Sequence, residues 1–148
     1  MIVSYDIDGV LAEGPPISEK KWGQMNKYER SDKKRFLLDW YRNAKPLLVP
    51  KDPYFFAVSA RKNDGEVYAA TKAWLDFYYP KRVVEIYLLE FKSRSVENAA
   101  TFKANIMIKE NVQVHYEDNK QVLKIMKELA PNVQYYFWKQ GMQDPIEY

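Results

Sequence analysis

Short apolar runs alternate along the chain with longer segments in which apolar residues recur every three or four positions. The short runs are typical of buried strands and cover residues 2–5, 54–58, 83–91, 112–116 and 132–138. The longer segments predict amphipathic helices over residues 66–79, 96–108 and 121–129. Alternation of this kind indicates an α/β domain with a mostly parallel sheet and helices on both faces. Residues 140–148 show no pattern, and we expect them to be irregular.

The stretch between the first two predicted strands interrupts this alternation. Residues 12–16 read as a loop, and Ser18 and the pair Ser31-Asp32 are candidate helix N-caps. A helix is indicated by apolar side chains at helical spacing, at Phe36, Leu37, Trp40 and Tyr41. We expect residues from about 12 to 50 to form a small, partly helical cap insert over the carboxyl ends of the strands. The alternative is a packed helical connection with a solvated basic face.

Composition limits the classes of protein that the chain can represent. Its 148 residues suit a single domain, and 47% hydrophobic and 29% charged residues are typical of a globular protein. No apolar run approaches the roughly 20 residues of a membrane span, and the N-terminus lacks a signal-peptide pattern. Without cysteine, disulfides and thiolate sites are excluded, and we expect a cytoplasmic protein with no membrane partner. A net charge of +3 permits a nucleic-acid partner without requiring one.

Polar residues gather where the predicted strands end. They are Asp6 and Asp8 after the first strand, Ser59 and Arg61 after the second, and Glu117 and Asp118 after the fourth. Because the carboxyl ends of parallel strands meet at one edge of a sheet, these side chains should converge. The bland alternative for Asp6 and Asp8 is an Asx-type turn. Two acids followed by Gly9-Val10-Leu11 at the end of an apolar strand favour a site that needs a cation.

These residue types suit the cleavage of a phosphate ester. Such a site needs a cation against the phosphoryl oxygens, an in-line nucleophile and an acid for the leaving group. Asp6 can be both a Mg²⁺ ligand and a nucleophile that forms an aspartyl-phosphate, and Asp8 can transfer the proton. Ser59 would donate a hydrogen bond to the phosphoryl group. Lys103 would act as a point charge, with Lys109 as the rival for that position.

The pattern resembles the haloacid dehalogenase (HAD) superfamily of aspartate-nucleophile phosphatases, which have a Rossmann-like fold. The residues that carry the resemblance are Asp6-Ile7-Asp8-Gly9-Val10-Leu11, Ser59 after a strand, Lys103, and the pair Glu117-Asp118. The resemblance implies that Asp6 is the nucleophile and Asp8 the general acid and base. It also implies that Mg²⁺ is held by Asp6, the backbone carbonyl of Asp8 and the side chain of Asp118. Many relatives have two aspartates at the fourth motif, so Glu117 is either a direct ligand or lies behind one.

A narrower likeness points to a class of substrate. Ser59-Ala60-Arg61, followed by a helix, a strand and the acidic pair, is similar to the 3′-phosphatase domain of phage polynucleotide kinases. That likeness implies that Arg61 contacts the substrate phosphate, and we expect Gly9, Ser59 and Arg61 to bind the substrate, a nucleotide or a nucleic-acid 3′ end. The alternative for Arg61 is a surface salt bridge. No Gly-x-x-x-x-Gly-Lys-Ser/Thr loop occurs, so the kinase activity of those enzymes is not expected.

Other functions remain open on the sequence. The enzyme could act on a small metabolite phosphate, or the chain could be a catalytically silent binding module of the same fold. In the phosphatase hypothesis the insert would contact the substrate through its basic and aromatic residues Trp22, Tyr28, Lys33, Lys34 and Arg35. Nucleic-acid binding as the primary role rests only on basic loops and scattered aromatic residues. The single histidine, His115, fits a buried structural residue better than a catalytic one. The sequence does not indicate an oligomeric state.

Overall fold

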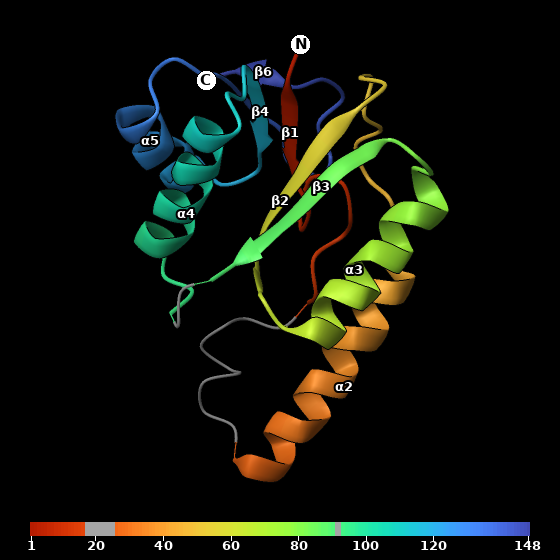
Figure 1. Ribbon diagram of the computed structural model, residues 1–148. Helices are drawn as coiled ribbons and strands as arrows, with labels where there is room; N and C mark the ends of the chain where they lie inside the picture. The colour runs from red at the N-terminus through yellow and green to blue at the C-terminus, as the bar shows by residue number, and fades with distance from the viewer. Residues whose placement is uncertain (17–25, 91–92) are drawn as a thin grey trace.

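The computed structural model describes residues 1–16, 26–90 and 93–148, with backbone alone for residues 27–30 (Figure 1). The elements in chain order are β1 (Val3–Asp6), α2 (Lys27–Asn43), β2 (Phe55–Lys62), α3 (Gly65–Tyr78), β3 (Val83–Leu89), α4 (Val96–Lys109), β4 (Val114–Glu117), α5 (Lys120–Leu129), β5 (Gln134–Phe137) and β6 (Ile146–Glu147). Among these described helices, none is long and apolar enough to cross a membrane.

The strands form one sheet in the order β3-β2-β1-β4-β5-β6. Strands β1 to β5 are parallel to one another, which confirms the predicted α/β fold with a mostly parallel sheet. The expectation that residues 140–148 are irregular is wrong in one part, because β6 pairs antiparallel with β5. Its two residues are too few to produce an alternating pattern, so the sequence carries no strand signal there.

Helices cover both faces of the sheet (Figure 1). Helices α2 and α3 lie on one face, where Trp74 and Leu75 belong to a buried cluster that includes residues of β1 and β2. Helices α4 and α5 lie on the other, where Met107 and Leu123 belong to a second buried cluster. Successive side chains of a strand point to opposite faces. The side chain of Tyr5 therefore joins the first cluster, while the neighbouring Asp6 faces α4.

Helix α2 begins at Lys27, so Ser31-Asp32 lies inside the helix and its prediction as an N-cap is wrong. Local capping preference is a weak signal, and packing of a long helix against a neighbour overrides it. Helix α2 packs beside α3 over much of its length (Figure 1). The other candidate N-cap, Ser18, lies outside the described residues.

Indole hydrogen bonds fasten the segment between β1 and β2 to the rest of the domain. The Nε1 of Trp40 donates to the carbonyl of Glu13 at 2.8 Å, and the Nε1 of Trp74 donates to the carbonyl of Ala44 at 2.8 Å. The first bond joins α2 to the loop after β1, and the second joins the end of α2 to α3. A packed helical connection, the alternative interpretation of the insert, requires packing of this kind.

Strand β2 is longer than predicted and continues to Lys62. Ser59 and Arg61 therefore lie inside the strand, close to its carboxyl end, and do not follow it. Beyond the strand, the side chain of Asp64 accepts hydrogen bonds from the backbone N–H groups of Glu66 and Val67 and caps α3. Ser95 and Asn119 cap α4 and α5 in the same way, which brings the N-termini of both helices to the carboxyl edge of the sheet.

Candidate active site

A cavity of about 190 Å³ lies at the carboxyl ends of β1, β2 and β4. The predicted site residues in its lining are Asp6, Asp8, Ser59, Lys103, Glu117 and Asp118. The structure thus brings together side chains that lie more than a hundred positions apart in the sequence. The lining also includes Arg94, Ser95 and Asn119, which the sequence analysis did not single out. Ser95 and Asn119 could have been identified from the sequence, because each is a typical N-cap residue directly before an apolar helical segment.

Lys103 occupies the floor of this cavity. Its Nζ lies 3.1 Å from Oδ1 of Asp6 and 2.6 Å from Oε1 of Glu117, and the side chain is 3% exposed. Burial alone would lower the pKa of Lys103, but the charges of Asp6 and Glu117 outweigh burial and raise it above its usual value. The ammonium group therefore stays charged and compensates part of the negative charge of the acids.

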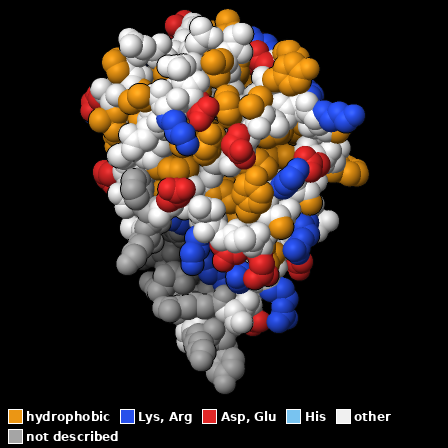
Figure 2. All heavy atoms as spheres, viewed as in Figure 1, with side chains coloured by type: hydrophobic (Ala, Val, Ile, Leu, Met, Phe, Trp, Pro, Cys, Tyr) orange, Lys and Arg blue, Asp and Glu red, His pale blue; other side chains and the backbone are white. Residues whose placement is uncertain are grey.

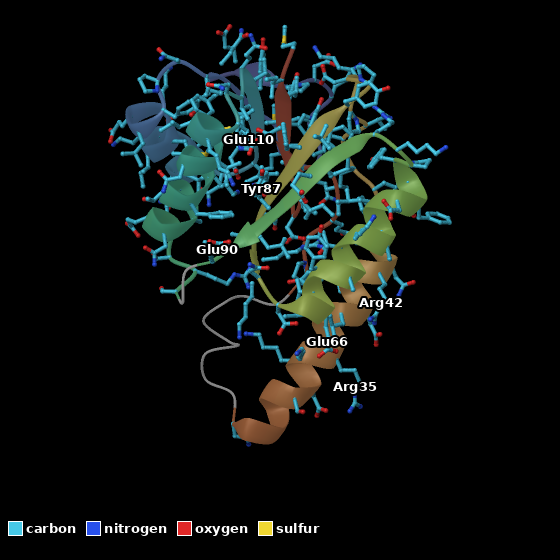
Figure 3. All side chains as sticks on the ribbon, viewed as in Figure 1. Arg35, Arg42, Glu66, Tyr87, Glu90 and Glu110 are labelled. Atoms are coloured by element: carbon cyan, nitrogen blue, oxygen red, sulfur yellow. The ribbon has the colours of Figure 1, made fainter. Side chains whose placement is uncertain are left out.

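The rival lysine lies elsewhere. The Nζ of Lys109 is 5.4 Å from the centroid of the Tyr87 ring. The hydroxyl of Tyr87 in turn donates to Oε1 of Glu110 at 2.7 Å, so this contact belongs to the junction of β3 with the end of α4 (Figure 3). Of the two candidates, Lys103 is the one in the cavity with Asp6.

Three acids of the cavity crowd one another. One carboxylate oxygen from each of Asp6, Glu117 and Asp118 lies within 4.8 Å of the other two. Burial, together with the charge of Glu117, raises the pKa of Asp6 well above its usual value and that of Asp118 to about 7. Like charges at this separation cannot all ionise without a compensating cation. Oxygen ligands from carboxylates are those that Mg²⁺ prefers, so this donor set fits the ion.

Glu117 differs from the other two acids. Burial would raise its pKa, but the charge of Lys103 and the hydrogen bond from His115 lower it well below the usual value. Its second oxygen accepts from the backbone N–H groups of Asp118 and Asn119 at 3.2 and 3.4 Å. Glu117 is thus a carboxylate whose oxygens already have donors, whereas the side chain of Asp118 carries the raised pKa.

Gly9 supports this arrangement of acids. Its φ of +88° lies in the left-handed region, and a Cβ at this position would collide with Oδ2 of Asp118. The close approach of the β1 loop to Asp118 therefore requires glycine. Gly9 was predicted to bind the substrate, and the structure places it against the Asp118 carboxylate.

Arg61 does not line the cavity and is 1% exposed. Its Nε and Nη2 donate to Oδ2 and Oδ1 of Asp8 at 3.0 and 2.8 Å, and its Nη1 donates to Oγ1 of Thr71 at 2.9 Å. The guanidinium carbon lies 3.8 Å from the centroid of the Tyr41 ring. Arg61 thus forms a salt bridge, as in the alternative interpretation, but its side chain is buried and the pair does not lie at the surface.

Ser59 and His115 lie on opposite sides of this cluster. Ser59 is 1% exposed, lines the cavity, and its Oγ accepts a hydrogen bond from the backbone N–H of Arg61 at 3.0 Å. His115 is fully buried, with Nδ1 2.7 Å from Oγ of Ser4 and Nε2 3.4 Å from Glu117. Burial lowers its pKa. This is the environment of a structural histidine, as expected from its place in an apolar strand.

The structure describes only some of the basic and aromatic residues of the insert. Trp22 lies outside the described residues, and of Tyr28 only the backbone is described. Lys34 forms ion pairs with Asp64 and Glu66 at 3.2 and 2.9 Å, which join α2 to the start of α3. Figure 3 labels Arg35 on α2 and Glu66 on α3 in this region. Basic and acidic side chains are intermixed at the lower end of the visible face in Figure 2, so no purely basic surface stands out there.

Comparison with known proteins identifies the fold. No protein-family model matches the sequence, and a search of curated proteins finds no match. Among solved structures, a chain of the Pnkp1/Rnl/Hen1 RNA repair complex superposes with a TM-score of 0.56 at 16% identity. The match covers 96% of this chain and 43% of that one, so this chain spans less than half of its length.

A second structure matches to the same degree. A HAD-superfamily hydrolase of subfamily IA from Geobacter sulfurreducens superposes with a TM-score of 0.56 at 8% identity, over 96% of this chain and 88% of that one. At these identities the superpositions establish architecture alone. The chain thus has the fold of a HAD-superfamily hydrolase, and it shares that fold with part of an RNA repair complex.

Proposed function

We propose that the protein is a Mg²⁺-dependent phosphomonoesterase that uses Asp6 as its nucleophile. The observation that carries the proposal is the contact of Lys103 with Asp6 and Glu117 in the same cavity as Asp118. A buried cluster of three acids and one lysine is costly to fold, because desolvation of its charges is only partly compensated. Such a cluster is therefore better explained by a bound cation and a phosphoryl group than by stability.

Each residue has a chemical task in this proposal. A carboxylate oxygen of Asp6 attacks the phosphorus, the bond to the leaving oxygen breaks, and Asp8 donates a proton to that oxygen. Asp8 then removes a proton from water, which attacks the phosphorus of the aspartyl-phosphate and releases inorganic phosphate and free Asp6. The Oγ of Ser59 already accepts from the Arg61 N–H, so its proton can be donated to a phosphoryl oxygen.

The acids divide the task of holding the cation. Asp6 and Asp118 would contribute carboxylate ligands, and the backbone carbonyl of Asp8 would contribute a third. Glu117 would lie behind them, because Lys103 and two backbone N–H groups already bind its oxygens. The bound Mg²⁺ would supply positive charge against the phosphoryl oxygens.

The substrate that we propose is the 3′-phosphate of a nucleotide or a nucleic-acid end. The cavity is smaller than the roughly 300 Å³ at which sites for whole small molecules begin, so it suits a phosphoryl group whose carrier stays outside. Arg94 is an exposed cation in its lining, placed to contact a neighbouring phosphate of such a carrier. The structural likeness to part of an RNA repair complex is consistent with this class.

A phosphate-release assay with Mg²⁺ tests the proposal. It compares mononucleotides, sugar phosphates and oligonucleotides phosphorylated at the 3′ or the 5′ end. We expect release from 3′-phosphates, loss of release with EDTA, and a fall by orders of magnitude in Asp6→Asn. Asp76→Asn is the matched control, because Asp76 forms an exposed ion pair with Lys72 on α3.

Each arm of the assay has a defined meaning. Release from mononucleotides or sugar phosphates without release from oligonucleotides would replace the proposed substrate by a small metabolite. Absence of Mg²⁺-dependent release from every ester would leave a binding module. Full activity in Asp6→Asn would refute the assignment of the nucleophile.

A further inference from the structure

The side chain that would transfer the proton is fixed by a buried arginine. Asp8 lines the cavity and its side chain is 24% exposed, whereas the Arg61 side chain that binds it is 1% exposed. The contact uses both carboxylate oxygens, with Nε donating to Oδ2 and Nη2 donating to Oδ1. A two-point contact of this kind fixes both the position and the plane of a carboxylate.

Arg61 is itself fixed on its remaining sides. Its Nη1 donates to Oγ1 of Thr71, and the Thr71 hydroxyl donates to the carbonyl of Val67 at 2.7 Å, so the acceptor is anchored in α3. The ring of Tyr41, a buried residue of α2, covers the guanidinium group at 3.8 Å. Both helices on this face of the sheet therefore contribute to the position of one guanidinium group.

The hydrogen-bond donors of Arg61 are already used within the protein, so few remain for a substrate. Each guanidinium nitrogen already donates to a protein oxygen, and Arg61 is absent from the lining of the cavity. To reach a substrate phosphate it would have to leave Asp8 without its partner. Arg94, unlike Arg61, does line the cavity.

We infer that Arg61 is a positioning residue that orients Asp8 toward the leaving oxygen, with Thr71 and Tyr41 as its supports, and that it does not bind the substrate phosphate. The inference rests on the proposed phosphomonoesterase function. It assigns to α2 a part in the proton transfer, through Tyr41.

Leaving-group dependence separates orientation of the acid from binding of the phosphate. p-Nitrophenolate departs readily without a proton, whereas phenolate is the poorer leaving group and gains more from an acid. Phenyl phosphate and p-nitrophenyl phosphate differ only by the nitro group, so their binding is closely matched. Single-turnover release of the phenol with Mg²⁺ and excess protein reports the first chemical step alone.

In Arg61→Lys we expect phenyl phosphate to lose about tenfold more rate than p-nitrophenyl phosphate, with little change in KM for either. Asp8→Asn should show the same preference, to a larger degree. Arg82→Lys is the matched control, because Arg82 also lies over aromatic rings, at Phe55 and Tyr79, and donates to backbone carbonyls away from the cavity. Its ratio of the two rates should equal that of the wild type.

A less disruptive variant guards against loss of folding. Thr71→Val keeps the shape of a β-branched residue and removes only the acceptor of Nη1, so it should change the ratio in the same direction by a smaller factor. Thermal unfolding of each variant identifies any that is not folded. If Arg61→Lys does not fold, the result with Thr71→Val decides the test.

Two results would overturn the inference while the proposed function stands. One is an equal loss on both esters with a raised KM in Arg61→Lys, which would make Arg61 a phosphate ligand. The other is an unchanged ratio in both Arg61→Lys and Thr71→Val while Asp8→Asn changes it. If the wild-type protein releases phosphate from no ester, the two aryl phosphates and the 3′-phosphorylated oligonucleotides included, the proposed function fails and the inference fails with it.

Discussion

The ammonium group of Lys103 lies 2.6 Å from a carboxylate oxygen of Glu117, and both side chains are almost completely buried. Fourteen positions separate the two residues, one on α4 and the other at the end of β4. Removing one partner of a buried pair leaves an uncompensated charge, which costs about 3–5 kcal/mol. The pair is therefore sensitive to any change that removes either charge.

Lys103→Met should consequently reduce both stability and phosphate release. We expect the free energy of unfolding to fall by about 3–5 kcal/mol and phosphate release to fall by orders of magnitude. Urea unfolding and the release assay measure the two effects. Lys109→Met is the control, because Lys109 contacts the face of Tyr87 instead of an acid, and it should cost less than about 1 kcal/mol. Equal losses in the two variants would contradict this account of the site.

The stability of the metal-free protein should depend on pH in a direction set by Asp118. Its pKa is raised from 3.8 to about 7, so the folded protein keeps a proton that the unfolded chain has already lost. An acid of this kind stabilises the fold at low pH, and the contribution is lost as pH rises through about 7. Asp6, whose pKa is also raised, adds to this fall, whereas His115, whose pKa is lowered, opposes it only up to its usual pKa of 6.5. Thermal unfolding in EDTA should therefore show a falling Tm between pH 6.5 and pH 8.

Saturating Mg²⁺ should reverse much of that fall, because the cation takes the place of the proton among the acids. Asp118→Asn should flatten the pH dependence in EDTA and remove most of the gain from Mg²⁺. A Tm that rises over this pH range in EDTA, or that Mg²⁺ leaves unchanged at pH 8, would contradict the proposed metal site.

Gly9→Ala should impair the site through Asp118. The added Cβ would collide with the Asp118 carboxylate, and the positive φ of Gly9 adds strain of order 1 kcal/mol for any other residue. We expect weaker Mg²⁺ binding, seen as a higher Mg²⁺ concentration for half-maximal phosphate release. Gly65→Ala is the control, because a Cβ at Gly65 meets nothing within 4 Å. Unchanged Mg²⁺ dependence in Gly9→Ala would show that Asp118 is not a ligand.

Arg94→Gln should discriminate between substrates of different size. If Arg94 contacts a neighbouring phosphate, its loss should raise KM for a 3′-phosphorylated oligonucleotide several-fold and weaken the salt dependence of KM. Release from p-nitrophenyl phosphate, which has no neighbouring phosphate, should change little. Equal effects on both substrates would place Arg94 at the reacting phosphoryl group instead. Lys120→Gln, at the exposed start of α5, provides a surface control of the same charge change.

The sequence was sufficient to predict the sheet and the convergence of Asp6, Ser59, Lys103 and Asp118. Strand-and-helix alternation determines which ends of parallel strands meet, and no side-chain geometry is needed for that step. The sequence favoured Lys103 over Lys109 without deciding between them, and the structure places Lys103 in the cavity and Lys109 beside Tyr87.

The roles of individual partners could not be predicted in the same way. Arg61 follows the pattern of a phosphate ligand in sequence, yet its place depends on Thr71 and Tyr41, which come from two helices whose packing no local pattern specifies. The contact of Gly9 with Asp118 could not be predicted either, because it depends on a distance across the fold. The sequence therefore suggested only that Gly9 binds the substrate. The start of α2 at Lys27 and the pairing of β6 with β5 were likewise set by tertiary contacts that override weak local signals.

The brief antiparallel strand β6 has a bearing on how the protein behaves at high concentration. Open sheet margins invite pairing with other molecules, and long flat ones are prone to aggregate. Here two residues shield part of the margin of β5 and offer only a short row of backbone groups to a neighbour. Deleting that pairing by Ile146→Pro would uncover β5, and the variant should lose solubility before it loses its native fold.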